Sequence, residues 1–164
     1  MSRQESDRED LLREATALVE RIELRLPGQL ESIVAGFRRD GAASYFFGAS
    51  PVYQFNAAGE LRRAFAGGLL YKVDGGQLVE MRRERTATAV ELISRRLNEL
   101  ETAVFLRQAE AALAQLTSAL VAGRVTVVGQ VSSDSSSPDV AAKIAAWLAA
   151  RPGRISLAQT SRLK

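Results

Sequence analysis

The chain has 164 residues, of which 46% are hydrophobic and 25% are charged, and its formal net charge is +3. These values are typical of a soluble globular protein and exclude disorder as a description of the whole chain. The sequence contains no cysteine and no histidine, which excludes disulfides, thiolate chemistry, iron–sulfur clusters and zinc sites built from these residues.

The N-terminal segment is predicted to be a helix. Ser6 is followed three residues later by Glu9, which is the spacing of a capping box. Apolar residues then recur at helical spacing, which predicts a helix over about residues 7–20. From Ile22 to Leu26, apolar and charged residues alternate, a pattern that fits a strand as well as the end of a helix. The polar start contains no apolar signal core, and we expect a cytoplasmic protein.

Residues 32–85 are predicted to form an antiparallel meander of five or six strands. Aromatic and β-branched residues lie there between tight turns rich in Gly, Asn and Asp, which is typical of strands joined by hairpins. The expected strands are Ser32–Phe37, Ser44–Phe47, Val52–Phe55, Leu61–Phe65, Leu69–Val73 and Leu78–Arg83. The alternation of apolar and polar residues suits a sheet with one well-covered face and one partly wet face.

The hydrophobic period changes to that of a helix after the meander, which predicts helices over about residues 88–122. Thr88 and Glu91 have capping-box spacing, and apolar residues then recur three and four apart. The apolar face shifts near Asn98, so the pattern fits one long helix or two helices broken at Asn98, of which we favour two. Gly123 is a typical helix stop.

Residues 124–150 are predicted to form a strand, a serine-rich loop and a helix. The valine-rich run 124–131 is expected to be a buried strand that joins an edge of the sheet. The loop is expected over residues 132–139, and within it the position of Ser137 before a proline is typical of a helix N-cap. A basic tail, residues 154–164, follows, with a short strand expected at residues 155–157.

Together these segments predict one α+β domain over residues 1–164. Its centre is the antiparallel meander, with the N-terminal helix and the C-terminal helices packed on it.

Paired arginines within the strands are the candidate binding residues. Neighbouring side chains of a strand point to opposite faces, so each pair places one guanidinium on each side of the sheet. Arg62, Lys72 and Arg83 would then form a basic stripe, if the hairpin registers align them. Cations beside aromatic residues on a sheet are typical of proteins that bind single-stranded nucleic acid. The competing interpretation is that these arginines are solvated charges balanced by nearby carboxylates.

A second hypothesis places a pocket inside a curled sheet, where it would bind a small molecule or catalyse a reaction. The candidate lining residues are Tyr53, Tyr71, Arg63 and Arg82. However, most general acid–base and nucleophilic catalysis depends on residue types that this chain lacks, and no catalytic group, metal ligand or cofactor motif is recognisable. The sequence therefore favours a binding protein over an enzyme.

The leading hypothesis is a non-catalytic binding or assembly module with an anionic partner, either a nucleic acid or an acidic protein surface. A sequence pI near 9.7 is compatible with such a partner. The apolar residues of Val90–Val121 cover more than one helix face, which predicts a homo-oligomer and leaves an oligomeric structural scaffold as a third hypothesis. No segment is long and apolar enough to span a bilayer, so no membrane partner is expected.

Overall fold

The structure, a computed structural model, describes residues 8–11, 13, 18–47, 51–132, 139–151 and 153–158, the side chains of Arg83 and Ser132 excepted. The strands are β1 (Glu20–Arg25), β2 (Ile33–Phe37), β3 (Ala43–Phe47), β4 (Val52–Phe55), β5 (Leu61–Ala66), β6 (Leu69–Asp74), β7 (Gln77–Arg85), β8 (Val90–Arg96) and β9 (Thr126–Ser132). Helix α2 (Glu99–Val121) lies between β8 and β9 in the chain, helix α3 (Val140–Ala150) follows β9, and residues 8–11 and 13 are also helical.

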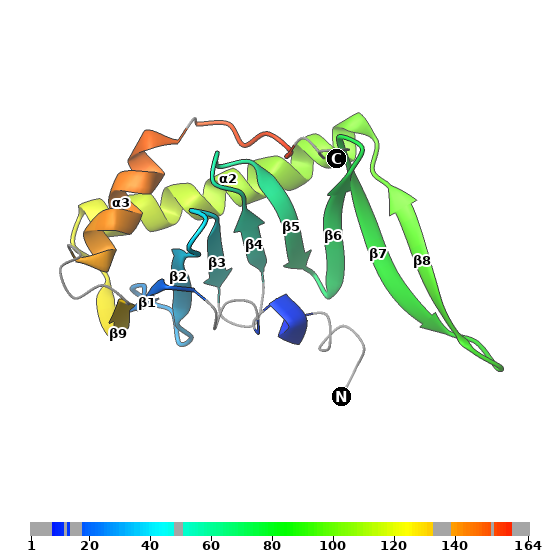
Figure 1. Cartoon of the computed structure of the whole chain (residues 1–164), viewed down its shortest axis with the longest axis horizontal. Helices are drawn as coiled ribbons and strands as arrows, with labels where there is room; N and C mark the ends of the chain where they lie inside the picture. The colour runs from blue at the N-terminus through cyan, green and yellow to red at the C-terminus, as the bar shows by residue number, and fades with distance from the viewer. Residues whose placement is uncertain are drawn as a thin grey trace.

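The described strands form one antiparallel sheet of nine strands in the order β8-β7-β6-β5-β4-β3-β2-β1-β9 (Figure 1). The α+β class is confirmed, but the sheet is larger than the five or six strands expected. All six expected segments between residues 32 and 85 are strands. The three strands outside the meander are β1, β8 and β9, of which β9 was expected at an edge of the sheet. Glu20 already belongs to β1, where it pairs with Phe37, so the first helix ends before residue 20.

The meander is predictable because its turns carry strong local signals. The β5–β6 turn is Gly67-Gly68 and the β6–β7 turn is Gly75-Gly76, and all four glycines have positive φ angles between 61° and 82°. Two-residue hairpin turns favour this conformation, which matches the twist of the flanking strands and which glycine adopts without strain.

The prediction of a helix from Val90 was wrong, because Val90–Arg96 is strand β8. Thr86 to Ala89 form the tight turn that joins it to β7: the amide of Thr86 donates to the carbonyl of Ala89, and the amide of Ala89 donates to the Thr86 hydroxyl. β8 then pairs with β7 along its whole length. The spacing of its apolar residues fits a helix, but cross-strand pairing with β7 decides the conformation.

The helix start predicted at Asn98 is confirmed by a capping box, but residues 88–122 contain strand β8 and one helix, α2, instead of the two helices expected. The side-chain oxygen of Asn98 accepts from the amide of Glu101 at 2.8 Å, and the Glu101 carboxylate accepts from the amide of Asn98 at 3.1 Å. At the other end, Gly123 follows the helix with a φ of 68°, as expected of a helix stop.

β9 joins the edge of the sheet as predicted, but it is not a buried strand. Val127, Val128 and Val131 remain about half exposed, at 50%, 50% and 48%. The reason is that β9 has one neighbouring strand, β1, at the end of the sheet order. The helix cap expected at Ser137 lies outside the described residues, and Asp139 caps α3 by accepting from the amide of Ala141.

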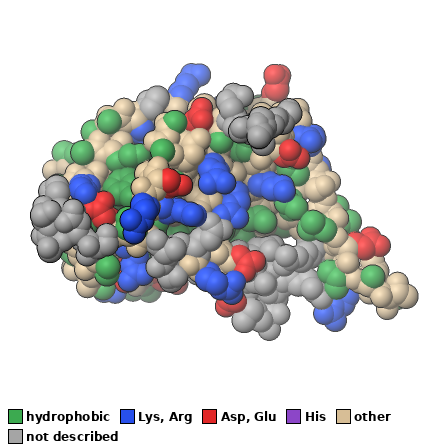
Figure 2. Space-filling view, in the orientation of Figure 1, with side chains coloured by type: hydrophobic (Ala, Val, Ile, Leu, Met, Phe, Trp, Pro, Cys, Tyr) green, Lys and Arg blue, Asp and Glu red, His purple; other side chains and the backbone are tan. Residues whose placement is uncertain are grey.

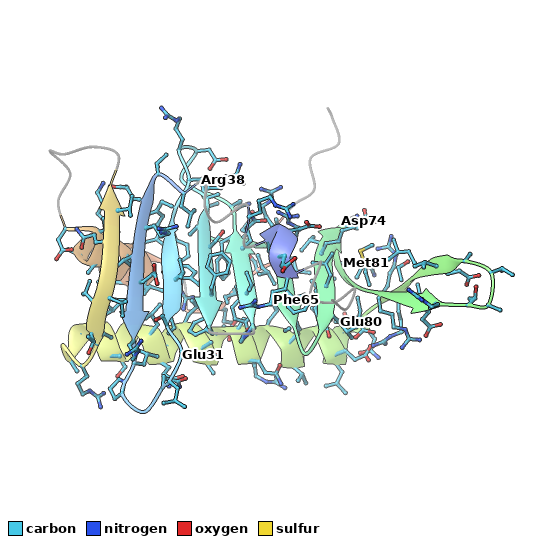
Figure 3. All side chains as sticks on the ribbon, turned by 90° about the horizontal axis from the view of Figure 1, so that it is seen from below. Glu31, Arg38, Phe65, Asp74, Glu80 and Met81 are labelled. Atoms are coloured by element: carbon cyan, nitrogen blue, oxygen red, sulfur yellow. The ribbon has the colours of Figure 1, made fainter. Side chains whose placement is uncertain are left out.

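Apolar layers cover both faces of the sheet. The main core lies between the sheet and helices α2 and α3, and its buried members include Tyr45, Phe55, Leu113 and Ile144. A smaller core lies on the opposite face, and its buried members among the described residues are Leu11, Leu18, Phe46, Val52 and Phe65. Figure 3 shows the helical residues near the N-terminus in front of the strands and α2 running across the strands behind them.

Near the C-terminus, Leu157 forms a parallel bridge to Leu61, where a short strand was expected. In the described part of the chain, no helix combines the length and the apolar character that crossing a membrane requires.

Candidate functional site

A line of cross-strand pairs runs over the whole sheet. From β9 to β8, its members are Val131, Arg21, Gly36, Ser44, Gln54, Arg63, Lys72, Val79 and Arg96. Residues paired in this way share a face, with Cβ atoms roughly 5 Å apart. We call this line the basic row because it contains four cationic residues: Arg21, Arg63, Lys72 and Arg96.

The basic row lies on the face opposite α2. Tyr71, the neighbour of Lys72 in β6, packs its ring 4.6 Å from the ring of Phe105 on α2. Since successive side chains of a strand point to opposite faces, Lys72 and its partner Arg63 point away from α2. Figure 2, in the orientation of Figure 1, shows Lys and Arg side chains near the middle of the molecule, whereas the face opposite α2 is the one turned to the viewer in Figure 3.

Neighbouring polar groups hold two of the four cations in place. The Nε atom of Arg63 donates to Oε1 of the buried Gln54 at 2.8 Å. Nη1 of Arg96 donates to the carbonyl of Asp74 and to Oε1 of Gln77, both at 3.0 Å. Lys72, between them in the row, is exposed. The row therefore presents two oriented guanidinium groups on either side of an exposed ammonium.

The predicted stripe of Arg62, Lys72 and Arg83 is not the alignment that the structure contains. Arg63, rather than Arg62, pairs with Lys72. The two-residue β5–β6 turn, Gly67-Gly68, sets this register, because Ala66 then pairs with Leu69 and Arg63 with Lys72. On the other side of β5, Phe55 pairs with Leu61 while Gln54 pairs with Arg63, so Arg62 is the additional residue of a bulge. Arg62 is exposed. The backbone of Arg83 pairs with Leu92 in the β7–β8 hairpin, and its side chain lies outside the described part.

The four residues expected to line a pocket do not converge. Tyr53 is buried on the α2 face, with its ring 6.4 Å from that of Phe105, and Tyr71 lies on the same face. Arg63 lies on the opposite face, and Arg82 forms an exposed ion pair with Glu84 at 2.9 Å. The curled-sheet pocket built from these residues is therefore absent.

Sequence analysis missed a polar network at the start of α2. Arg95 was expected on a helix away from the sheet, but it lies on β8 and donates to both carboxylate oxygens of Glu101, at 3.0 and 2.9 Å. Its other terminal nitrogen lies 3.4 Å from the Glu80 carboxylate, which also accepts from the Tyr71 hydroxyl at 3.2 Å. The hydrogen bond from the Asn98 amide, followed by that from Arg95, lowers the pKa of Glu101.

This network borders an apolar groove of about 350 Å³. Leu97, Leu100, Val104 and Phe105 form much of its lining. The acids and the arginine at its rim bind one another, which fits a structural network better than a catalytic one.

All three tyrosines of the chain lie on the α2 face, and their pKa values are raised. Burial raises the pKa of Tyr53 to about 12, and burial and then Glu80 raise the pKa of Tyr71 to about 12. Burial raises the pKa of Tyr45 well above 10.0. The neutral phenols therefore stabilise the fold below pH 10, and this contribution is lost as the pH rises from about 10 towards about 12.

We expect the free energy of unfolding to fall over that interval, with tyrosinate absorbance rising only as the fold is lost. Parallel titrations of the native and the urea-unfolded protein check this. A native titration centred near pH 10, like that of the unfolded chain, would contradict the burial of these tyrosines.

The chemistry available on the basic row is that of cations and amides, which bind anions. Among the described residues, no group of three or more potential metal-ligating side chains is placed to hold an ion. Comparison of the chain with protein-family models, with curated proteins and with solved structures finds no match.

Proposed function

We propose that the protein is a non-catalytic binding module that engages an acidic surface of another protein through the basic row. The observation that carries the proposal is the direct cross-strand pairing of Arg63 with Lys72. Like charges in directly opposite positions of a sheet destabilise it. A carboxylate of an acidic partner that binds between the two side chains would contact both cations and offset this repulsion.

Arg96 lies two strands beyond Lys72 in the same row, with its Nη2 atom 3.5 Å from the carboxylate of Asp74. Because Gln54 and Gln77 already orient the neighbouring guanidinium groups, less side-chain entropy is lost when they bind an anion. Guanidinium groups held in this way bind carboxylates with charge-assisted hydrogen bonds.

An acidic protein is favoured over single-stranded nucleic acid because of where the aromatic residues lie. Proteins that hold single strands combine cations with exposed rings on which bases stack. Here the three tyrosines lie on the α2 face. On the face of the basic row, Phe46 and Phe65 are buried against Leu11 and Leu18. A carboxylate-rich surface requires no such rings.

The test compares the binding of polyglutamate and of a single-stranded oligonucleotide at low salt. We expect polyglutamate to bind, and Lys72→Glu to weaken that binding about tenfold, which corresponds to about 1.4 kcal/mol. Arg107→Glu is the matched control, because it changes the net charge equally at an exposed position of α2. It should alter the affinity less than about twofold.

Equal losses of polyglutamate affinity in Lys72→Glu and Arg107→Glu would contradict binding at the basic row. They would indicate that the affinity depends only on the total charge of the protein. Tighter binding of the oligonucleotide than of polyglutamate, with the same dependence on Lys72, would assign the row to nucleic acid instead. Failure of the wild-type protein to bind either probe would reject the proposal.

A further inference from the structure

Strand β8 forms one edge of the sheet. It is the first strand in the sheet order, and no strand of the described part of the chain pairs with its outer side. Six of its seven residues are exposed. Figure 1 shows the β7–β8 hairpin extending away from the helices. A regular exposed edge of this kind offers a template for pairing with another strand.

The direction of each backbone group in β8 follows from its ladder with β7. The amide of Leu97 donates to the carbonyl of Leu78, and the amide of Thr86 donates to the carbonyl of Ala89. No register shift interrupts the ladder between these two bonds. Because inward and outward positions alternate in an antiparallel ladder, the amides and carbonyls of even-numbered residues point outward. These residues are Val90, Leu92, Ser94 and Arg96.

The opposite edge of the sheet is less suited to pairing. In β9, Val127 pairs with Leu24 and Gly129 pairs with Glu23, so Val128 is an additional residue that interrupts the register. Bulges of this kind disturb an edge ladder and discourage pairing with another chain. β8, whose register is continuous, is therefore the edge suited to a partner strand.

We propose that two copies of the chain pair antiparallel through β8, around a two-fold axis at Ile93. In this register, Val90 lies opposite Arg96 of the second copy, and Leu92 lies opposite Ser94 of the second copy. All seven residues of the strand are paired, and the outward backbone groups of both copies are satisfied. The two sheets become one, with the same face of each on the same side.

The charges of β8 select this register. Within one copy, Glu91 lies opposite Glu84, an unfavourable pair of like charges. The two-fold axis at Ile93 places Glu91 opposite Arg95 of the second copy, and symmetry makes this contact twice. Each Glu91 would thereby join the network that Arg95 forms with Glu80 and Glu101. Shifting the register by two residues in either direction separates Glu91 from Arg95.

This inference is independent of the proposed function, and it replaces the helix-based dimer expected from Val90–Val121. The part of that segment that forms the interface is the strand, Val90–Arg96, rather than the apolar face of a helix. In such a dimer the two basic rows lie on the same side of the combined sheet.

The first test removes one outward amide. Leu92→Pro deletes an N–H that points away from β7, and edge strands tolerate proline at such positions. We expect the wild-type protein to sediment at twice its chain mass of 17.8 kDa and Leu92→Pro at 17.8 kDa, with unchanged circular dichroism. Leu92→Ser, which keeps the amide, is the matched control and should remain dimeric. A monomeric wild-type protein at the highest attainable concentration, or a dimeric Leu92→Pro, would overturn the proposal.

The second test measures the register. The chain has no cysteine, so Ile93→Cys introduces a single thiol. At the two-fold axis this position is a non-hydrogen-bonded pair with Cα atoms roughly 4.5 Å apart, which a disulfide spans. We expect Ile93→Cys to form a covalent dimer under mild oxidation. Glu91→Cys, opposite Arg95 of the second copy, should not. The reverse result, or equal crosslinking of both variants, would contradict the axis at Ile93.

Discussion

Gly36→Ala should lower the free energy of unfolding by about 3 kcal/mol, although alanine is ordinarily the better residue within a strand. Gly36 lies within β2, paired with Arg21 on one side and Ser44 on the other. A Cβ atom at this position would lie 2.1 Å from the carbonyl oxygen of Glu20 and 2.9 Å from Cα of Arg21. Both are backbone atoms, so relief requires β1 to move away from β2.

Gly129→Ala is the matched control for this substitution. Gly129 also lies within a strand, β9, and a Cβ atom there would meet only Oε1 of Glu23, at an ordinary contact distance of 3.8 Å. Its free energy of unfolding should change by less than about 0.5 kcal/mol. Urea denaturation followed by circular dichroism measures both variants. Equal stability of the two would show that β1 and β2 are not as close as described.

Leu113→Ala should lower the free energy of unfolding by about 3 kcal/mol, because the substitution would open a large cavity in the main core. Leu113 lies in the middle of α2 and is fully buried, at 0% exposure. Packing of this helix across the strands holds the two layers of the main core together.

Leu100→Ala, in the first turn of the same helix, provides the comparison. Leu100 is 71% exposed, so its replacement should change the free energy of unfolding by less than about 0.5 kcal/mol. Denaturation midpoints with unchanged slopes would give both values. A small effect of Leu113→Ala would mean that α2 does not pack on the sheet with this face.

The sequence predicts the meander well because its information is local. Each hairpin is marked by residues suited to its turn, such as Gly67-Gly68, between runs of alternating residues. β8 lacks such information. Val90, Ile93 and Leu97 are spaced three and four apart, as in a helix, and the pairing of β8 with β7 overrides that spacing.

The candidate site was predicted in part for the same reasons. Strand alternation identifies Lys72 and an arginine of β5 as neighbours across the hairpin. The two-residue turn Gly67-Gly68 sets the register in which Arg63, rather than Arg62, pairs with Lys72. The bulge between Gln54 and Phe55, which no local signal marks, decides only which residue of β5 pairs with Gln54. Arg96 was missed because its segment was expected to be helical.

The most direct test of binding through the basic row is the salt dependence of polyglutamate affinity. Wild-type affinity should fall steeply as salt rises, because exposed charges are screened. Lys72→Ala should give a shallower dependence, since one ionic contact is lost, whereas Arg107→Ala should keep the wild-type slope. Identical slopes for the wild-type protein and Lys72→Ala would contradict the assignment of binding to this row.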